Sequence, residues 1–329
     1  MNILENGMRS TAIVCTFIFL AACTPEKPVI TIPSVVPPDI TPTRTAEIMA
    51  ERDSPGTPSP VAAEECARGD YFDQIESNGQ TRQYLLHVPP TYKPEEPAAL
   101  LLVFHGAGIG AERFVDYIRF SNVADREGFL IVYPEGLNEA WDPSPGSRDV
   151  GFISDLIDYL QKRCQVDPNR IYASGHSNGG GMVHRLACEL ADRFAAIGTI
   201  SGAYQSSGQC TPSRPVPVFA IHGTADNIIP YEGIPHWAAD WAERNDCDPE
   251  PIEIPHNVLI RETKWSNCRE GADVILYTIQ DLGHDWTHDL INMGQTIWDF
   301  FKAHPHRAGN EHQPRIGTDG SRWIRDRNG

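Results

Sequence analysis

One serine of this chain lies in a segment whose residue types suit nucleophilic chemistry. Ser177 is the central residue of Gly175-His176-Ser177-Asn178-Gly179, which follows a short apolar strand and precedes an amphipathic helix. A serine in such a strand–turn–helix segment has a strained backbone and an exposed hydroxyl, and the flanking glycines avoid Cβ collisions with the strand and the helix. The segment therefore predicts a nucleophile elbow, in which a serine attacks an acyl group.

An acid and a base follow this serine in the order that the elbow requires. A serine hydroxyl needs a base to take its proton, and the base needs a third group to orient it. Asp226 follows the apolar run 218–221, and His284 follows the run 274–279. Each is expected in a loop just after a strand, with Asp226 as orienter and His284 as base. His222 is interpreted as a support for the acid loop, and three histidines are rival candidates for the base: His222, His236 and His288.

Two backbone N–H groups near the serine are expected to stabilise a negatively charged oxygen. Asn178, the residue after the nucleophile, supplies one of them. The loop Phe104-His105-Gly106-Ala107-Gly108 follows an apolar strand and supplies the other, with Ala107 as the expected donor. Each donor can lower the reaction barrier by roughly 3–4 kcal/mol.

A second pattern near the predicted base resembles a zinc motif but lacks its requirements. His284-Asp285-Trp286-Thr287-His288 carries Asp where the zinc motif carries Glu, a glycine precedes it, and no third histidine follows at a suitable spacing. The cysteines contain no Cys-x-x-Cys pair. We therefore expect neither a metal nor another cofactor.

Apolar periodicity predicts the elements that must position these residues. Helical spacing is clear at 150–163 and 182–190, and apolar runs typical of buried strands occur at 84–88, 100–104, 129–133, 171–174, 196–200, 218–221 and 274–279. Strands that alternate with helices predict an α/β fold with a mostly parallel sheet covered by helices on both faces. In such a fold ligands bind beyond the carboxyl ends of the strands, where every candidate residue lies. Residues 66–304 suit one such domain.

The N-terminal segment predicts that the protein is exported. Residues 1–22 combine an early positive charge with a 12-residue apolar run, which is too short to span a bilayer, and Leu20-Ala21-Ala22-Cys23 resembles a lipobox. The resemblance implies cleavage before Cys23 and a lipid on its sulfur, and ordinary secretory cleavage is the alternative. Residues 23–65 are rich in proline and threonine and predict a tether, while 305–329 predict a disordered tail.

Charge and cysteines narrow the function further. The formal net charge is −17, which argues against nucleic acid and anionic polymers as partners. The membrane is expected as a partner only through the lipid anchor. Apart from Cys15 and Cys23, six cysteines lie in the predicted exported domain, and they predict up to three disulfides. Six cysteines can pair in 15 ways. The pair named here is Cys247 with Cys268, which would close one insertion.

Several segments, in the same order along the chain, resemble one branch of a known superfamily. They are residues 104–106, 149–153, 167–182, 186–188, 194–196, 222–233 and 282–286. Together they resemble the feruloyl esterase and polyhydroxybutyrate depolymerase branch of the α/β-hydrolases, of the carbohydrate esterase family one type. The resemblance implies the same roles for Ser177, Asp226 and His284. The Thr-His-Asp segment after Trp286 departs from relatives that often carry proline there, which leaves the substrate open.

The resemblance implies an exported serine esterase that acts on feruloyl or acetyl esters of plant cell-wall polysaccharides or their fragments. A depolymerase of polyhydroxybutyrate or short polyesters is the first alternative, and a catalytically silent surface binding protein is an alternative of another class. Trp237, Trp286 and Tyr204 are predicted to contact the substrate, because aromatic rings can stack on a phenolic acid or a sugar. Three further indoles are expected near the mouth of the same pocket: Trp141, Trp241 and Trp265.

Overall fold

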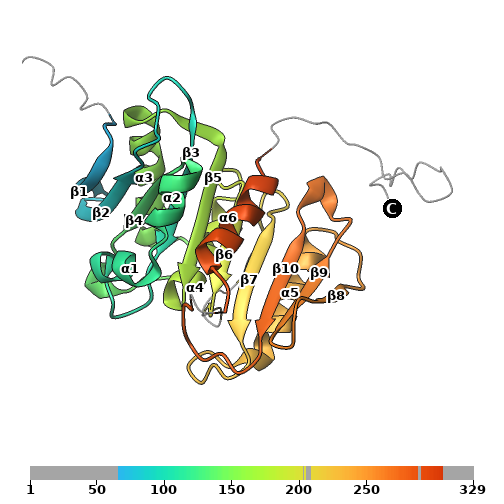
Figure 1. The fold of residues 1–329 in the computed structure, drawn as a ribbon. Helices are drawn as coiled ribbons and strands as arrows, with labels where there is room; N and C mark the ends of the chain where they lie inside the picture. Colours follow the sequence, from blue (N-terminus) through green and yellow to red (C-terminus); the bar gives the residue numbers. More distant parts are fainter. Residues whose placement is uncertain (1–65, 203, 205–208, 288–289, 307–329) are drawn as a thin grey trace, which may run out of the picture. The chain divides into compact units, whose positions relative to one another are not determined.

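The computed structural model describes residues 66–202, 204, 209–287 and 290–306 (Figure 1). The predicted signal segment, Cys23 and the predicted tether lie outside these ranges, as does nearly all of the predicted tail. None of the helices within the described ranges combines the length and the hydropathy that crossing a membrane requires.

The described residues form one mixed sheet of ten strands in the order β1-β2-β4-β3-β5-β6-β7-β10-β9-β8. The six central strands, from β4 to β10 in this order, are parallel, and the pairs at both edges are antiparallel. The strands are β1 (Gly69–Ser77), β2 (Gln80–Val88), β3 (Ala98–Phe104), β4 (Leu130–Pro134), β5 (Val166–His176), β6 (Ala196–Ile200), β7 (Val218–Gly223), β8 (Ile252–Pro255), β9 (Ile260–Trp265) and β10 (Val274–Ile279).

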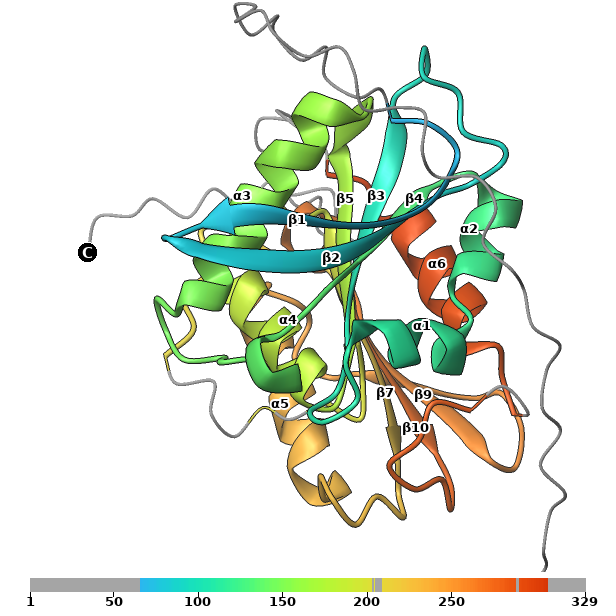
Figure 2. The ribbon, with the colours of Figure 1, turned by 90° about the vertical axis from the view of Figure 1, so that its left-hand side faces the viewer.

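Helices cover both faces of this sheet, as Figure 2 shows. One face carries α3, α4 and α5, and the other carries α1, α2 and α6. Their bounds are α1 (Ala111–Ile118), α2 (Ser121–Glu127), α3 (Arg148–Arg163), α4 (Asn178–Glu189), α5 (Ile234–Arg244) and α6 (Met293–Ala303), with short 3₁₀ turns η1 (Leu137–Glu139), η2 (Tyr231–Gly233) and η3 (Arg269–Gly271). The predicted α/β fold, with a mostly parallel sheet between helices, is confirmed.

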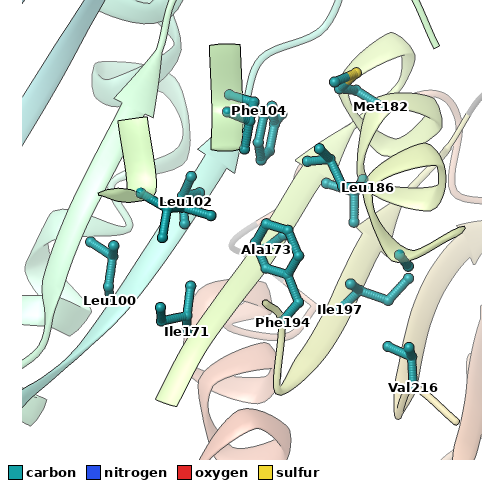
Figure 3. Close-up of a cluster of buried hydrophobic side chains, with 14 of the residues drawn as sticks. Leu100, Leu102, Phe104, Ile171, Ala173, Met182, Leu186, Phe194, Ile197 and Val216 are labelled. Atoms are coloured by element: carbon teal, nitrogen blue, oxygen red, sulfur yellow. The ribbon is translucent and has the colours of Figure 1, made fainter. Parts of the chain in front are cut away.

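Two apolar cores, one on each face, hold the helices to the sheet. Side chains alternate along β3, so that Leu100 and Leu102 contribute to one core and Leu101 and Val103 to the other. Figure 3 shows the first core, in which Met182 and Leu186 of α4 face β3, β5 and β6. Full burial of one such side chain contributes about 1.5–3 kcal/mol, so this packing fixes the start of α4 firmly.

The parallel central strands bring the loops that carry the candidate residues to one edge. Because parallel strands share a direction, β3, β5, β7 and β10 all end at the same side of the sheet. The chain leaves these strands into the loop around Ala107, the elbow at Ser177, the loop of Asp226 and the loop of His284. The edge strands β1, β8 and β9 were not predicted, since their partly exposed residues give only a weak pattern.

Candidate active site

The elbow has the strained backbone that the sequence predicts. Ser177 lies between β5 and α4 with φ 55° and ψ −121°, a conformation that side-chain-bearing residues rarely adopt. Its N–H donates to the carbonyl of Ile200 on β6 (3.0 Å), which anchors the turn to the sheet. A Cβ on Gly179 would lie 2.3 Å from the carbonyl oxygen of Phe104, and one on Gly175 would lie 2.5 Å from the Gly179 backbone. Glycine is therefore required at both positions.

The acid and the base predicted from the sequence are in contact. His284 Nδ1 lies 2.8 Å from Asp226 Oδ2. The other carboxylate oxygen, Oδ1, accepts the N–H groups of Ile228 (3.0 Å) and Ile229 (2.8 Å). Burial raises the pKa of Asp226, but these hydrogen bonds and the one from His284 outweigh it, and the pKa is lowered overall. A carboxylate fixed in this way can orient an imidazole and stabilise its positive charge.

His284 also lies beside the elbow. Its ring centroid is 4.9 Å from that of His176, the residue before Ser177. The carbonyl of Leu282 accepts the Ala225 N–H (3.0 Å), which ties the loop of the base to the loop of the acid. The structure therefore brings the elbow, Asp226 and His284 together at one edge of the sheet.

His222 takes the supporting position that was predicted for it. Its Nε2 lies 2.9 Å from the carbonyl of Ile229 and 3.3 Å from Asp226 Oδ2. Because a carbonyl only accepts, Nε2 carries a proton and faces the acid loop as a donor. Burial lowers the pKa of His222, which favours this neutral ring. Of the other rival bases, His236 is exposed on α5 and His288 lies outside the described residues.

The two residues predicted to supply the oxyanion donors flank the elbow. Asn178 is the first residue of α4, so its N–H has no acceptor within the helix. Its side-chain amide bridges the backbone of Trp141, with Oδ1 accepting from N–H (2.7 Å) and Nδ2 donating to the carbonyl (3.1 Å). On the other side, a Cβ built on Gly106 would lie 3.3 Å from Ser177 Cβ, which places the residue before Ala107 against the serine.

One residue close to the site was not singled out from the sequence. His176 is buried between the rings of His284 and Phe114, and its Nε2 has no hydrogen-bond partner among the described residues. Burial, followed by the neighbouring charge of His284, lowers the pKa of His176 to about 4. Its place inside the elbow motif was a signal, but only the folded chain shows that its ring turns toward the base.

The three aromatic residues predicted to bind substrate are packed inside the protein. Trp286 is 2% exposed and contacts Phe114 and Phe120, so it joins the core on the side of α1. Trp237 and Tyr204 stack on each other with centroids 3.8 Å apart and keep less than a tenth of their surfaces. The further indoles Trp141, Trp241 and Trp265 are also buried. The burial of these side chains indicates that they pack in the protein core. It does not support their predicted contact with the substrate, which stays a prediction.

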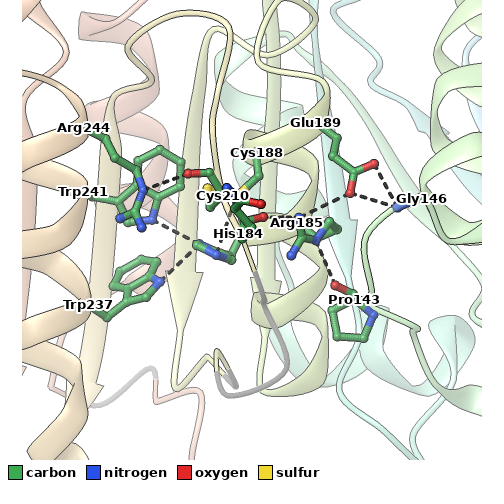
Figure 4. The surroundings of a disulfide bond; sticks show 11 residues. Pro143, Gly146, His184, Arg185, Cys188, Glu189, Cys210, Trp237, Trp241 and Arg244 are labelled. Carbon is green, nitrogen blue, oxygen red and sulfur yellow. Dashed lines mark hydrogen bonds and ion pairs between the residues drawn. A yellow bond between two sulfur atoms is a disulfide. The ribbon is translucent and has the colours of Figure 1, made fainter.

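One cluster of residues of the types that bind metals lies within the described part of the chain, around a buried histidine beside a disulfide. His184, Cys188 and Cys210 place their ligand atoms within 4.8 Å of one another (Figure 4). The two cysteines form a disulfide, so they offer no thiolate. His184 Nδ1 accepts the indole N–H groups of Trp237 (3.2 Å) and Trp241 (3.1 Å). These hydrogen bonds join α4, which carries His184, to α5, which carries both tryptophans, so the cluster has a structural role.

The one disulfide pairing predicted from the sequence is confirmed. Cys247 and Cys268 are bonded, and two further bonds join Cys66 to Cys164 and Cys188 to Cys210. The last two connect residues from separate elements, which spacing along the chain cannot identify.

The fold and the site define an α/β-hydrolase with a serine, a histidine and an aspartate at the carboxyl edge of its sheet. Residues 82–213 match the family described as Esterase PHB depolymerase. The chain is 32% identical over 275 residues to NocK of Nocardia uniformis subsp. tsuyamanensis, which is named as a candidate esterase, and the match covers 80% of this chain and 76% of NocK. It is also 32% identical over 235 residues to feruloyl esterase C of Emericella nidulans, covering 68% and 84% of the two chains.

A solved structure shows the same fold. The acetyl xylan esterase from Aspergillus awamori superimposes with a TM-score of 0.60 at 15% identity, covering 70% of this chain and 99% of that one. Together these matches show that the chain belongs to the feruloyl esterase and polyhydroxybutyrate depolymerase branch of the α/β-hydrolases. It is a carboxylic ester hydrolase, which leaves no support for a catalytically silent binding protein.

Proposed function

We propose that this ester hydrolase works through Ser177 as nucleophile, His284 as base and Asp226 as orienter. The 2.8 Å contact between His284 Nδ1 and Asp226 Oδ2 carries the proposal. With the Nδ1 proton held by the carboxylate, Nε2 of His284 is the nitrogen that can take the serine proton. The serine oxygen then attacks the ester carbonyl, and His284 passes the proton to the departing alcohol. In the second step His284 takes a proton from water while the water oxygen attacks the acyl-enzyme carbonyl, and His284 then returns the proton to the departing Ser177 Oγ, which releases the acid and restores the free serine.

The tetrahedral oxygen formed in each step needs donors that are already in place. We assign the N–H groups of Asn178 and Ala107 to this role. The start of α4 supports the first assignment, and the closeness of Gly106 to Ser177 supports the second. Removal of one such donor typically costs a hundredfold to a thousandfold in kcat, or about 3–4 kcal/mol.

Feruloyl or acetyl esters of plant cell-wall polysaccharides, or of their fragments, are the proposed substrates. The similarity to feruloyl esterase C of Emericella nidulans supports the feruloyl class. A short aliphatic polyester is the second candidate, because the matching family is described as a PHB depolymerase. A parallel assay on methyl ferulate, acetylated xylan and a hydroxybutyrate oligomer separates these classes. Strong activity on the oligomer with none on methyl ferulate would reverse the ranking.

The serine assignment has a direct test. We expect Ser177→Ala to abolish hydrolysis of p-nitrophenyl acetate while the thermal unfolding midpoint stays near that of the parent protein. A fluorophosphonate probe should label the parent protein at Ser177 and leave the variant unlabelled, as read by peptide mass spectrometry. Retained turnover in Ser177→Ala would exclude the mechanism.

Export and attachment through a lipid on Cys23 are part of the proposal. Three disulfides support an oxidising compartment, because such bonds are rare in reducing cytosol. We expect the full chain to fractionate with membranes of a bacterial host, and Cys23→Ala to release the folded domain or block its processing. Immunoblots of membrane and soluble fractions check this. Equal distributions for both chains would contradict the lipid anchor.

A further inference from the structure

A second buried histidine lies directly beside the elbow and contacts two loops at once. His105 follows the last residue of β3 and is fully buried. Its Nδ1 lies 2.9 Å from the carbonyl oxygen of Gly106, and its Nε2 lies 2.9 Å from the N–H of Gly136 in the loop after β4. Its own carbonyl accepts the indole N–H of Trp141 (3.1 Å). The mechanism above makes no use of this ring.

The two ring contacts determine where the proton of His105 lies. A carbonyl oxygen only accepts, so Nδ1 must carry a proton to bond Gly106. A backbone N–H only donates, so Nε2 must be without a proton to bond Gly136. Glu135 Oε1 lies 3.3 Å from Nε2, farther than the Gly136 nitrogen, and its other oxygen accepts the Ala111 N–H (2.7 Å). The neutral Nδ1–H form satisfies both short contacts.

The bond to the Gly106 carbonyl sets the direction of the neighbouring N–H. The carbonyl of Gly106 and the N–H of Ala107 belong to one peptide plane and, in a trans peptide, point in opposite directions. No cis peptide occurs among the described residues. Because His105 holds the carbonyl on its own side, the Ala107 N–H points away from the ring. A Cβ built on Gly106 would lie 3.3 Å from Ser177 Cβ, so the Gly106–Ala107 peptide begins beside the serine. The next N–H, of Gly108, is already bonded to the carbonyl of Glu139 (2.8 Å).

The loop after β4 fixes the other proposed donor as well. Gly136 lies near the start of this loop and Trp141 near its middle, and the side-chain amide of Asn178 hydrogen-bonds the backbone of Trp141 through both its oxygen and its nitrogen. Gly136 and the indole of Trp141 hold His105. His105 and Asn178, one on each side of the proposed oxyanion hole, therefore both hydrogen-bond to residues of one segment, 136–141.

We propose that His105 is a positioning residue whose neutral ring orients the Gly106–Ala107 peptide, so that the Ala107 N–H is aimed at the oxyanion before the substrate arrives. The proposal rests on the function proposed above. It adds the side chain of His105 to the proposed oxyanion hole, which is otherwise formed by the backbone N–H groups of Asn178 and Ala107. Preorganised donors accelerate the chemical step without tightening binding of the ground state, so the effect belongs in kcat rather than KM.

Two amide substitutions separate the two ring nitrogens. In His105→Asn the side-chain NH₂ falls near the position of Nδ1 and can still donate to Gly106. In His105→Gln the amide reaches the position of Nε2 and can still accept from Gly136, but the donor to Gly106 is lost. We expect His105→Gln to lower kcat on p-nitrophenyl acetate about 10- to 100-fold with little change in KM. The loss should not exceed that expected when a whole oxyanion donor is removed. His105→Asn should recover most of that loss.

A transition-state analogue provides a readout that loose packing would not move. Affinity for a boronic acid, which forms a tetrahedral adduct on the serine, should fall in His105→Gln by the same factor as kcat/KM. Affinity for the product acid should stay the same. Equal damage in both variants, or a kcat in His105→Gln within about threefold of the parent value, would overturn the proposal.

Measurements on the unmodified protein keep the test independent of variant folding. Nitrogen-15 NMR of histidine-labelled protein should place the His105 proton on Nδ1 and leave Nε2 bare. A proton on Nε2 would overturn the proposal. Fluorophosphonate labelling of Ser177 in the same sample reports whether the serine mechanism itself holds, so the two failures are distinguishable.

Discussion

His284 and His184 are both largely buried histidines, but their Nδ1 atoms face partners of opposite polarity. The Nδ1 of His284 faces a carboxylate oxygen of Asp226 at 2.8 Å. The Nδ1 of His184 faces two indole N–H groups at 3.1 and 3.2 Å. A ring held by a carboxylate is stabilised when it gains a proton, whereas a ring that accepts two N–H donors would lose both bonds.

The surroundings of His184 strengthen this contrast. Burial, followed by the positive charges of Arg244 and Arg185, lowers the pKa of His184 to about 3. His184 therefore stays neutral at any pH where the enzyme is expected to work, and its role is to join α4 to α5. The comparison shows that burial alone does not decide whether a histidine can act as a base, because the polarity of the group that faces its Nδ1 also matters.

The largest predicted effect comes from making the partner of His284 resemble that of His184. Asp226→Asn presents an amide to Nδ1, removes the charge and favours the wrong tautomer of His284. We expect kcat to fall on the order of a thousandfold to ten-thousandfold. Steady-state kinetics on p-nitrophenyl acetate measure this, with His184→Gln as the control that changes kcat little. A variant that keeps a tenth of the activity would contradict the assigned role of Asp226.

The disulfide beside His184 should carry the next largest effect. Cys188 and Cys210 are 22 residues apart, and replacing both by alanine should lower the free energy of unfolding by about 3 kcal/mol. The pair Cys247 and Cys268, 21 residues apart, provides a matched control with a similar expected loss. Chemical denaturation measures both. Tryptophan fluorescence should change in the first variant, whose bond lies beside Trp237 and Trp241. An equal change in both variants would argue against the bracing role.

The neutral state of His184 predicts a dependence of stability on acid. The pKa of His184 is about 3 in the folded protein and about 6.5 in the unfolded chain, so the unfolded chain binds more protons once the pH falls below 6.5. Stability is therefore unaffected by this group above pH 6.5 and is lost progressively below it. Between pH 6.5 and 5 the loss should be about 2 kcal/mol. The difference between parent and His184→Gln in denaturant unfolding at the two pH values isolates it, and no difference would show a charged His184.

The smallest effect should come from single indole donors. Trp237→Phe and Trp241→Phe each keep a six-membered aromatic ring but lose the pyrrole part with its N–H, and the lost hydrogen bond to His184 Nδ1 should cost about 1 kcal/mol in each. Because both indoles share one acceptor, the double variant should cost more than the sum of the two, since it leaves the nitrogen without a partner. Urea unfolding of the three variants measures the coupling. Strict additivity would mean that the two bonds are independent.

Much of the fold could be predicted from local pattern. The apolar runs at 196–200 and 274–279 coincide with β6 and β10, and the helical spacing at 150–163 falls within α3. These segments are buried on well-defined faces, so their periodicity is strong. The half-exposed strands at the edges and the short helices α1 and α2 carry weaker patterns, and they became visible only in the folded chain.

The sequence by itself determined the identity of the candidate site. The order of Ser177, Asp226 and His284, each after an apolar strand, was sufficient because parallel strands must bring their carboxyl ends to one edge. It also determined the need for glycine around the serine, since the elbow leaves no room for a Cβ at Gly175 or Gly179.

Only the tertiary structure decided which side chains serve that site and which serve the core. Trp237 and Trp286 lie in segments that suggested a substrate mouth, yet both indoles pack inside, because the direction of a side chain depends on the elements around it. The orientation of His105 toward the Gly106 carbonyl, the pairing of Cys188 with Cys210 and the indole partners of His184 all join residues from different elements. Spacing along the chain carries no record of such contacts.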